Sequence, residues 1–354
     1  MQDLSIGTQT FKQLREETRI YVDKTRYAYE VLTKPNAYFL SRPRRFGKSL
    51  FLSTLMELAE GNRALFNGTW VDDNWDWNVK YPVIHLKFAS MPYQGLGLEE
   101  AIRLRILDKY KEENILPHTT DLKELFYNLV VELHKTQNKV VILIDEYDKP
   151  ILDAIEKENS VLSEERRETM KTFYSVLKDC EPYLQCTFVT GITKFAKVSI
   201  FSDLNHLNDL TFDIDFATAF GYTQEELETN FSDYLQDLVQ NKTGLTYEIL
   251  LAEIKEWYNG YSWDGVTSVY NPYGLVHFFA KKRFGDYWFE SGTPSILTKR
   301  VLNQRTFAVE NLTMNISDLN FHTIDGISNV ALLFQATPIL QKKRLSTSNP
   351  SSKT

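Results

Sequence analysis

The residues with the clearest potential for chemistry lie at positions 38–50, in the stretch YFLSRPRRFGKSL. Residues 38–40 are apolar and predict a short buried strand, and the apolar periodicity of residues 50–59 predicts a helix. Between them stand Gly47, Lys48 and Ser49, in the order found in a phosphate-binding loop. In such a loop the glycine lets the backbone approach a phosphate, the lysine reaches the β- and γ-phosphates, and the hydroxyl holds Mg²⁺.

The same stretch departs from the full GxxxxGK[ST] pattern at its first position. Arg42 stands where the first glycine is expected, and Pro43, Arg44 and Arg45 follow it. The short GKS motif also fits a purely structural interpretation, in which its lysine and serine only begin a helix at the surface. The motif by itself leaves nucleotide binding and a plain helix start as alternatives.

Two adjacent carboxylates follow the most apolar strand pattern of the chain. Residues 139–144 are mostly aliphatic, which predicts a strand buried on both faces of a parallel sheet, and Asp145 and Glu146 follow directly. Ligands of α/β sheets bind at the carboxyl ends of strands, so we expect these acids near the phosphate loop. There Asp145 would accept hydrogen bonds from Ser49 and from a Mg²⁺-bound water, and Glu146 would polarise an attacking water. The alternative is that the strand ends in acids because it reaches solvent.

A further strand is predicted for residues 184–191, and hydroxyl groups cluster at its end. Thr190, Thr193 and Lys194 are candidates to sense the γ-phosphate or the attacking water. A strand end beside the acidic strand is a suitable place for such a group.

The segment one helix before the phosphate loop offers candidate contacts to the base and ribose of a nucleotide. Asp23 and Lys24 stand there, before a predicted helix at residues 27–32. The same residues fit a structural alternative, a helix start capped by Asp23 or by Thr25.

Composition and charge limit the classes of function. The 354 residues allow two compact domains, and a net charge of −7 does not favour a nucleic-acid binder, so any phosphate contact must come from local basic clusters. Cys180 and Cys186 have no metal-ligand spacing and predict reduced thiols. No apolar run is long enough to span a bilayer and no signal peptide is recognisable, which predicts a cytoplasmic protein without membrane contact.

The remaining pattern predicts an α/β core followed by a small helical domain. We expect the core at residues 1–220, a lid-like helical domain at 221–335, and a disordered tail at 336–354. Strands and helices outside the motifs above are predicted at residues 82–88, 98–111, 121–136, 150–158, 164–180, 225–231, 234–239, 246–257, 273–282 and 294–302, and further structure at 319–334.

Eight ordered motifs carry a family resemblance. They are YVDKT, FLSRPRRFGKSLFLS, VVILIDEYDKPI, FYSVLKD, FVTGITKFAKVSIFSDLNHLNDL, WYNGY, VYNPYGLV and YWFESGTP. With these motifs the chain resembles the bacterial AAA-ATPase-like proteins from about residue 4 to residue 334. The resemblance implies a P-loop NTPase core of the ASCE, AAA-like type, with a parallel sheet flanked by helices.

The same resemblance assigns roles by motif position, and it treats RPRRFGKS as a normal form of the loop. It implies Lys48 and Ser49 as Walker A residues, Asp145 and Glu146 as Walker B residues, and positions 190–194 as a sensor. The expected ATP-binding residues are Asp23, Lys24, Arg44, Arg45, Phe46, Gly47, Lys48, Ser49 and Leu50, with Glu146, Lys48 and Thr190 as catalytic residues and Ser49 and Asp145 as Mg²⁺ ligands.

Members of that family usually continue into a domain similar to PD-(D/E)XK nucleases. No such carboxylate and lysine pattern is recognisable in these 354 residues. We therefore expect a truncation or frameshift after about Gln335, which resequencing of the locus would test.

Three functions follow as hypotheses. The first is a Mg²⁺-dependent ATPase, which could form a homo-oligomer because an arginine finger often comes from a neighbouring subunit. The second is a slow ATP-gated switch or defence-type sensor that acts on a partner or on nucleic acid. The third is a remnant of an ATPase–nuclease fusion.

Overall fold

The computed structural model describes residues 1–157, 159–192, 201 and 207–287. The predicted sensor residues Thr193 and Lys194 lie outside the described residues, as do the segments at 294–302 and 319–334 and the predicted disordered tail.

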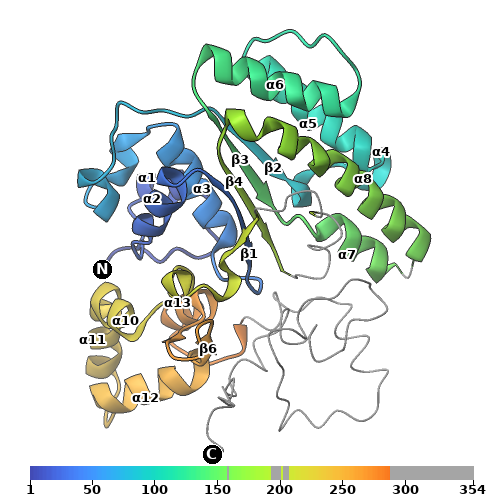
Figure 1. The fold of residues 1–354 in the computed structure, drawn as a ribbon. Coiled ribbons are helices and arrows are strands. Elements are labelled where there is room, and N and C mark those ends of the chain that lie inside the picture. Colours follow the sequence, from blue (N-terminus) through green and yellow to red (C-terminus); the bar gives the residue numbers. More distant parts are fainter. Residues whose placement is uncertain (158, 193–200, 202–206, 288–354) are drawn as a thin grey trace, which may run out of the picture.

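A parallel five-stranded sheet forms the centre of the described structure (Figure 1). Its strands are β1 Asn36–Ser41, β2 Val83–Lys87, β3 Val140–Asp145, β4 Leu184–Gly191 and β5 Asn208–Asp209. Their order is β2-β3-β4-β1-β5, so β4 lies between the strand before the phosphate loop and the strand before the paired acids. The predicted α/β class is confirmed.

The central strand β3 is buried on both faces, as its aliphatic run predicts. Val140, Ile142 and Ile144 face one hydrophobic core, whereas Val141 and Leu143 face a second core on the other side of the sheet. Alternation of side chains along a strand explains this division. Complete burial of β3 leaves Asp145 at its end without contact to bulk water.

Helices cover both faces of the sheet (Figure 1). One face is covered by α4 Tyr93–Leu96, α5 Leu98–Glu112, α6 Leu122–Thr136, α7 Lys149–Glu156 and α8 Ser160–Cys180. The other face carries α1 Phe11–Glu16, α2 Thr25–Thr33 and α3 Lys48–Ala59. Helix α8 packs on the sheet through an apolar stripe of buried side chains, Met170, Phe173, Tyr174 and Leu177.

Residues 224–287 form a mainly helical region with a hydrophobic core of its own. Its elements are α10 Gln224–Asn230, α11 Ser232–Asn241, α12 Tyr247–Tyr258, β6 Tyr261–Ser262, β7 Ser268–Val269 and α13 Pro272–Lys281. The antiparallel pair β6–β7 is absent from the sequence prediction, since two residues per strand give no periodic signal. Ile20 and Val22 from the N-terminal segment complete this core, so the helical region is joined to the start of the chain. The division into domains at residue 220 stays a prediction.

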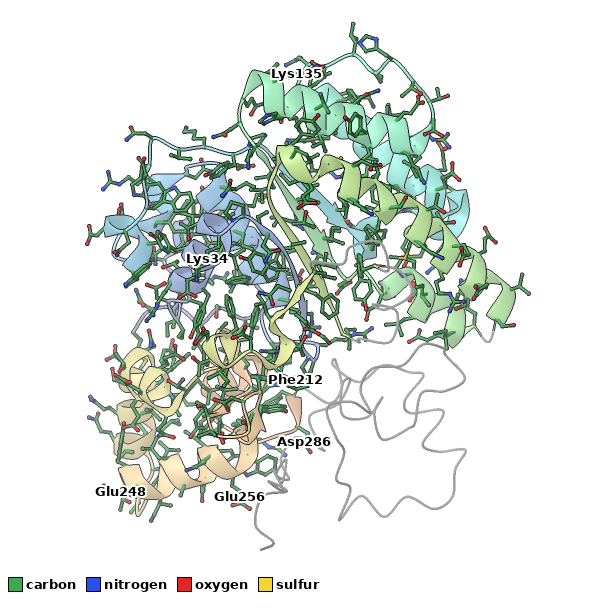
Figure 2. The ribbon with its side chains drawn as sticks, in the orientation of Figure 1. Lys34, Lys135, Phe212, Glu248, Glu256 and Asp286 are labelled. Atoms are coloured by element: carbon green, nitrogen blue, oxygen red, sulfur yellow. The ribbon has the colours of Figure 1, made fainter. Side chains whose placement is uncertain are left out.

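The helical region lies beside the sheet at the end where the phosphate loop is found. In Figure 2, α12 carries Glu248 and Glu256 on the side away from the sheet, where both are exposed. Helix α13 lies on the near side, close to β1 (Figure 1). This arrangement places α13 against the loop that follows β1.

Two further expectations concern the thiols and the membrane. Cys180 and Cys186 are both free and buried, and the predicted reduced state is consistent with this. Among the helices of the described residues, none combines the length and the apolar character needed to cross a membrane.

Candidate functional site

The loop between β1 and α3 is a tight turn with two residues in the left-handed backbone region. Gly47 adopts φ 87° immediately before the helix, and Arg45 adopts φ 70°. The left-handed region costs a residue with a side chain about 1 kcal/mol or more, so glycine is suited to position 47. The helix starts at Lys48, two residues earlier than its apolar periodicity predicts, because the polar Lys48 and Ser49 form its first turn.

The Lys48 ammonium group is buried and closes the loop on itself. Its Nζ donates to the carbonyl oxygens of Arg42 at 2.9 Å and Pro43 at 3.0 Å. Burial lowers the pKa of Lys48, and the nearby carboxylates of Asp145 and Glu146 oppose that shift. Within the part of the chain that the structure describes, the hydrogen-bond acceptors of this cation are two backbone carbonyls, and an incoming anion would be a stronger partner.

A chain of hydrogen bonds joins three elements behind the loop. Ser49 Oγ, in the first turn of α3, donates to Asp145 Oδ2 at 2.6 Å, and Thr190 Oγ1 at the end of β4 donates to Asp145 Oδ1 at 2.9 Å. The predicted approach of Ser49 to Asp145 is therefore present in the structure. Thr190 reaches the carboxylate because β4 lies beside β3, and it bonds to Asp145 on the side away from Ser49.

Glu146 follows β3 in a left-handed backbone conformation, with φ 56°. A residue with a side chain seldom adopts this conformation outside functional or strained sites. The side chain is half-buried, and burial followed by the charge of Asp145 raises its pKa, while Lys48 and Arg44 act in the opposite direction. Glu146 thus combines a raised pKa with access to the cavity, which suits a group that handles a proton or a water.

A pocket of about 630 Å³ lies over the loop. Nine of the predicted site residues line it: Lys24, Arg44, Arg45, Phe46, Gly47, Lys48, Ser49, Leu50 and Glu146. Its other walls come from the N-terminal segments 5–9 and 20–22, from residues 219–222, and from α13. Asp23, Asp145 and Thr190 do not line it, although Asp145 lies directly behind Ser49.

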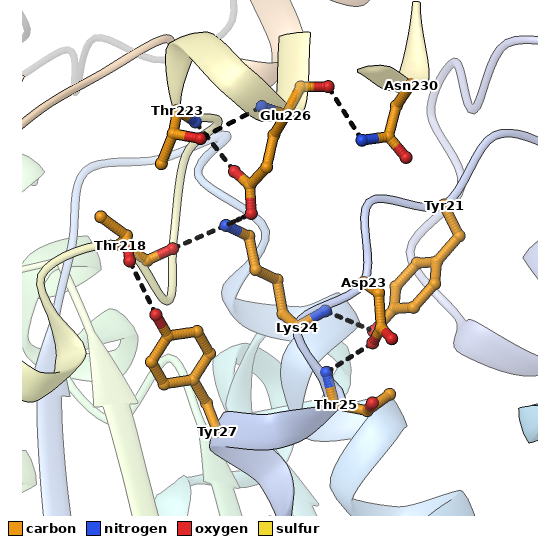
Figure 3. Close-up of polar contacts among 9 residues, drawn as sticks. All are labelled: Tyr21, Asp23, Lys24, Thr25, Tyr27, Thr218, Thr223, Glu226 and Asn230. Carbon is orange, nitrogen blue, oxygen red and sulfur yellow. Dashed lines mark hydrogen bonds and ion pairs between the residues drawn. The ribbon is translucent and has the colours of Figure 1, made fainter. Parts of the chain in front are cut away.

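Asp23 and Lys24 are both engaged by the protein itself (Figure 3). The carboxylate of Asp23 accepts hydrogen bonds from the backbone nitrogens of Thr25 at 2.8 Å and Trp70 at 2.6 Å. The N-cap of α2 is Lys24, without a side-chain capping bond, so neither Asp23 nor Thr25 is the N-cap that the structural alternative predicted. Lys24 Nζ donates to the carbonyl oxygen of Thr218 at 2.7 Å and forms an ion pair with Glu226 at the start of α10. Their predicted contacts to a nucleotide stay a prediction.

Arg42 turns away from the loop and into the protein. It is 1% exposed, its Nη1 donates to the carbonyl oxygens of Ser41 and Thr211, and its guanidinium lies 4.1 Å from the ring centroid of Trp263. Burial lowers the pKa of Arg42 to about 9. The residue that replaces the first glycine of the motif thus joins the loop to residues far along the chain.

Phe46 also connects the loop to the helical region. Its ring contacts Tyr261 at 4.7 Å and Trp263 at 5.8 Å between centroids. Together with Ala217 and Val269, these residues form a small separate core that we call the Phe46 cluster. Because the ring is buried in this cluster, only the backbone of Phe46 is left to face the pocket, and its role in ATP binding stays a prediction.

Sequence reasoning missed the contribution of α13. Tyr273 and His277 line the pocket, and the Arg45 guanidinium lies 4.8 Å from the ring centroid of Tyr273. The only local signal was the helix start at Asn271, whose side chain accepts from Gly274 N. That signal predicts a helix but does not indicate what the helix faces.

The oxygen atoms of this site match those that Mg²⁺ prefers. A hydroxyl and a carboxylate, from Ser49 and Asp145, are hard donors of the kind found beside nucleotide phosphates. No group of three or more histidine, cysteine or acidic residues that could hold a metal occurs within the described part of the chain. A metal here would therefore share its coordination with phosphate and water, as Mg²⁺ commonly does.

Comparison with known proteins adds the family. No solved structure matches this chain. A protein from Azotobacter chroococcum mcd 1, described as an uncharacterized protein in the vnfD 5′ region, is 38% identical over 338 residues, which cover 94% of this chain. The chain spans 63% of the length of that relative. The model of the AAA-ATPase-like family, described as "Predicted AAA-ATPase", matches residues 5–201, and the chain belongs to this family.

Proposed function

We propose that this chain binds ATP and hydrolyses it with the help of Mg²⁺. The observation that carries the proposal is the meeting of three groups at one pocket. Lys48 and Ser49 begin α3, and the carboxylates that end β3 lie beside them, with Ser49 Oγ 2.6 Å from Asp145 Oδ2. A phosphate-binding loop opposite two acids is the arrangement that phosphoryl transfer to water requires.

In this proposal each residue has one task. The Lys48 ammonium exchanges its two carbonyl acceptors for oxygens of the β- and γ-phosphates, which stabilises their charge in the transition state. Ser49 and Asp145 would hold Mg²⁺, which would neutralise phosphate charge. Thr190 keeps the Asp145 carboxylate in place through its hydrogen bond. Glu146 orients the attacking water and accepts its proton.

The pocket also offers room for the nucleoside. Tyr21, Val22, Tyr222 and Val276 supply apolar and aromatic walls on the side formed by the N-terminal segment and the helical region. A volume of about 630 Å³ lies within the usual range for sites that bind molecules of nucleotide size.

Two variants separate binding from turnover. We expect Lys48→Ala to weaken ATP affinity at least tenfold in calorimetry with Mg²⁺, since a charged phosphate contact contributes more than about 1.4 kcal/mol. Glu146→Gln should keep affinity within about threefold and lose steady-state phosphate release by about 100-fold or more. Lys123→Ala, an exposed lysine of α6, is the matched control and should change neither quantity. Unchanged ATP affinity in Lys48→Ala would overturn the proposal.

A second function, a slow ATP-gated switch, is favoured by one specific observation. The loop contacts the helical region at three points, through Arg42, Arg45 and Phe46. Any movement of the loop on nucleotide binding would reach that region. One ATP held per chain with almost no phosphate release in the wild type would support the switch, whereas steady turnover lost in Glu146→Gln supports the ATPase.

A further inference from the structure

Asp153, buried on α7, is held by side chains from two helices. Lys149 Nζ, one turn earlier on the same helix, forms an ion pair with its Oδ1, and Tyr93 Oη on α4 donates a hydrogen bond to its Oδ2 at 2.7 Å. Burial by itself would raise the pKa of Asp153, but the hydrogen bonds from Lys149 and Tyr93 outweigh burial and lower that pKa. The carboxylate is therefore charged at neutral pH and joins α4 to α7.

Arg166 on α8 adds a third helix to this group. The residue is buried, its Nη1 donates to the carbonyl oxygen of Pro150 at 2.7 Å, and its guanidinium lies 5.0 Å from the centroid of the Tyr93 ring. We call Tyr93, Lys149, Asp153 and Arg166 the Asp153 network. Buried ion pairs add little net stability, because desolvation offsets their attraction. The network does, however, join α4, α7 and α8 at the first turn of α7, on one face of the sheet (Figure 1).

The first turn of α7 also holds the backbone of Glu146. Lys149 N donates to the carbonyl oxygen of Glu146 at 3.0 Å. Glu146 has φ 56°, and a residue with a side chain keeps such a conformation only where its surroundings enforce it. The network is close to Glu146 in space as well, because burial, Asp153 and then the charge of Glu146 raise the pKa of Tyr93.

We propose that the Asp153 network positions Glu146: Tyr93, Asp153 and Arg166 fix the first turn of α7, and that turn holds Glu146 in its left-handed conformation. This inference rests on the proposed function, in which Glu146 orients the attacking water, and it adds positioning residues to that reaction. Tyr93 and Asp153 do not line the pocket, so they act only through α7. A small displacement of the Glu146 carboxylate would lower the rate, because its reach to the water depends on its position.

The test replaces Tyr93 and not Lys149, because Lys149 lines the pocket and its loss would combine two effects. Tyr93→Phe removes one hydroxyl and keeps the ring beside Arg166. We expect kcat to fall about tenfold and KM to stay within twofold, because Tyr93 does not touch the nucleotide. A Tyr93→Phe protein with the kcat of the wild type would overturn the inference.

The matched control is Tyr110→Phe on α5. It also removes a buried hydroxyl, which donates to the carbonyl oxygen of Leu125 at 2.9 Å, and Tyr110 lies outside the pocket lining. Both kcat and KM should stay within twofold of the wild type in this variant. A tenfold loss of kcat here would show that any buried hydroxyl of this kind has the effect, and the inference would fail.

The Glu146→Gln background separates positioning from a general loss of structure. Without a carboxylate to position, Tyr93→Phe should change the residual rate of phosphate release less than twofold. A tenfold loss in both backgrounds would mean that Tyr93 supports the whole site, and the proposed role at Glu146 would be wrong.

Amide hydrogen exchange of the free protein tests the same contact without nucleotide. Peptides that cover residues 147–152 should exchange about tenfold faster in Tyr93→Phe than in the wild type, and no faster in Tyr110→Phe. Unchanged protection in Tyr93→Phe would overturn the inference. If the wild type releases no phosphate, or Glu146→Gln releases it as fast as the wild type, the proposed function fails, and hydrogen exchange still decides whether the network fixes the first turn of α7.

Discussion

At the scale of single residues, Arg42 shows how an arginine in place of the first glycine of a loop motif changes the contacts of that loop. The glycine expected at this position would make the loop flexible. The buried guanidinium of Arg42 instead donates hydrogen bonds to the carbonyl oxygens of Thr211 and Phe216 and stacks on the ring of Trp263. With the carbonyl oxygen of Ser41 these partners engage both Nη groups, whereas Nε has no partner among the described residues. The residue therefore stabilises the loop by contact with distant segments.

Arg42→Gly, which restores the usual pattern, is expected to destabilise the protein. It leaves a cavity beside Trp263 and removes the donors to the two carbonyl oxygens, which together cost about 3 kcal/mol in the free energy of unfolding. Urea denaturation measures this loss. Arg44→Gly, at a partly exposed arginine of the same loop, is the control and should cost less than about 1 kcal/mol. An Arg42→Gly protein as stable as the wild type would show that the guanidinium contacts contribute nothing.

The raised pKa of Glu146 predicts how the rate of hydrolysis depends on pH. Burial and Asp145 raise its pKa, so the carboxyl group stays protonated to a higher pH than an ordinary glutamate. A base acts as the carboxylate, and the rate therefore falls as pH decreases through that raised pKa. The acid limb of kcat/KM should have its midpoint above 4.5, the ordinary value for this carboxyl.

The residual rate of Glu146→Gln is the control for this pH dependence. Glutamine cannot titrate, so the acid limb should disappear in this variant. An acid limb that persists with the same midpoint would assign it to another group.

At the scale of elements, the tip of β4 positions the acids that follow β3. Tyr147 N donates to the carbonyl oxygen of Thr190 at 3.0 Å, and Ile192 N donates to Asp148 Oδ2 at 3.0 Å. Between them Gly191 lies so close to the residues after Glu146 that a Cβ would stand 2.4 Å from a Tyr147 ring carbon. The absence of a side chain at Gly191 allows these two strand ends to come together.

Gly191→Ala is accordingly expected to displace Tyr147 and to lower the free energy of unfolding by about 1–3 kcal/mol. It should also reduce phosphate release, because Glu146 precedes the displaced tyrosine. Gly95→Ala in α4 is a matched control, since a Cβ there meets no atom within 4 Å. Thermal unfolding and turnover of both variants check the prediction, and a Gly191→Ala protein that matches Gly95→Ala in both measurements would contradict it.

At the scale of the whole molecule, the N-terminal segment connects the sheet to the helical region. Ile20 and Val22 enter the core of the helical region, and Lys24 pairs with Glu226 of α10 (Figure 3). The same segment lines the pocket. This segment therefore borders both the pocket and the helical region.

A double-mutant cycle on Lys24→Met and Glu226→Gln measures that connection. The two side chains are 11% and 25% exposed, and we expect a coupling free energy of about 1–2 kcal/mol from urea denaturation. The surface pair of Lys135 and Glu132, at 62% and 41% exposure, serves as control and should give less than about 0.5 kcal/mol. Equal coupling in the two cycles would show that burial of the Lys24 pair has no effect.

Local patterns in the sequence predicted strands β1 to β4 and the long helices that cover the sheet, whereas the two-residue strand β5 and the short helix α4 were not predicted. The aliphatic run of β3 predicted a strand buried on both faces, and a helix was predicted at residues 225–231, where the structure has α10. Nine predicted nucleotide-site residues share one pocket because the loop, the helix start and the acid after β3 are each set by neighbours in the chain. Periodicity and turn chemistry act over a few residues, so they can be read from the sequence.

By itself, then, the sequence determined a parallel α/β fold and predicted that the loop at residues 42–49 lies near the acids Asp145 and Glu146. Only the tertiary structure decided where Arg42 points, that Lys24 pairs with Glu226 202 positions away, and that His277 enters the pocket. These contacts depend on how segments far apart in the chain pack, and no local periodicity specifies that packing. The direction of Arg42 was set by the carbonyl oxygen of Thr211, 169 residues further along the chain, and by the aromatic ring of Trp263.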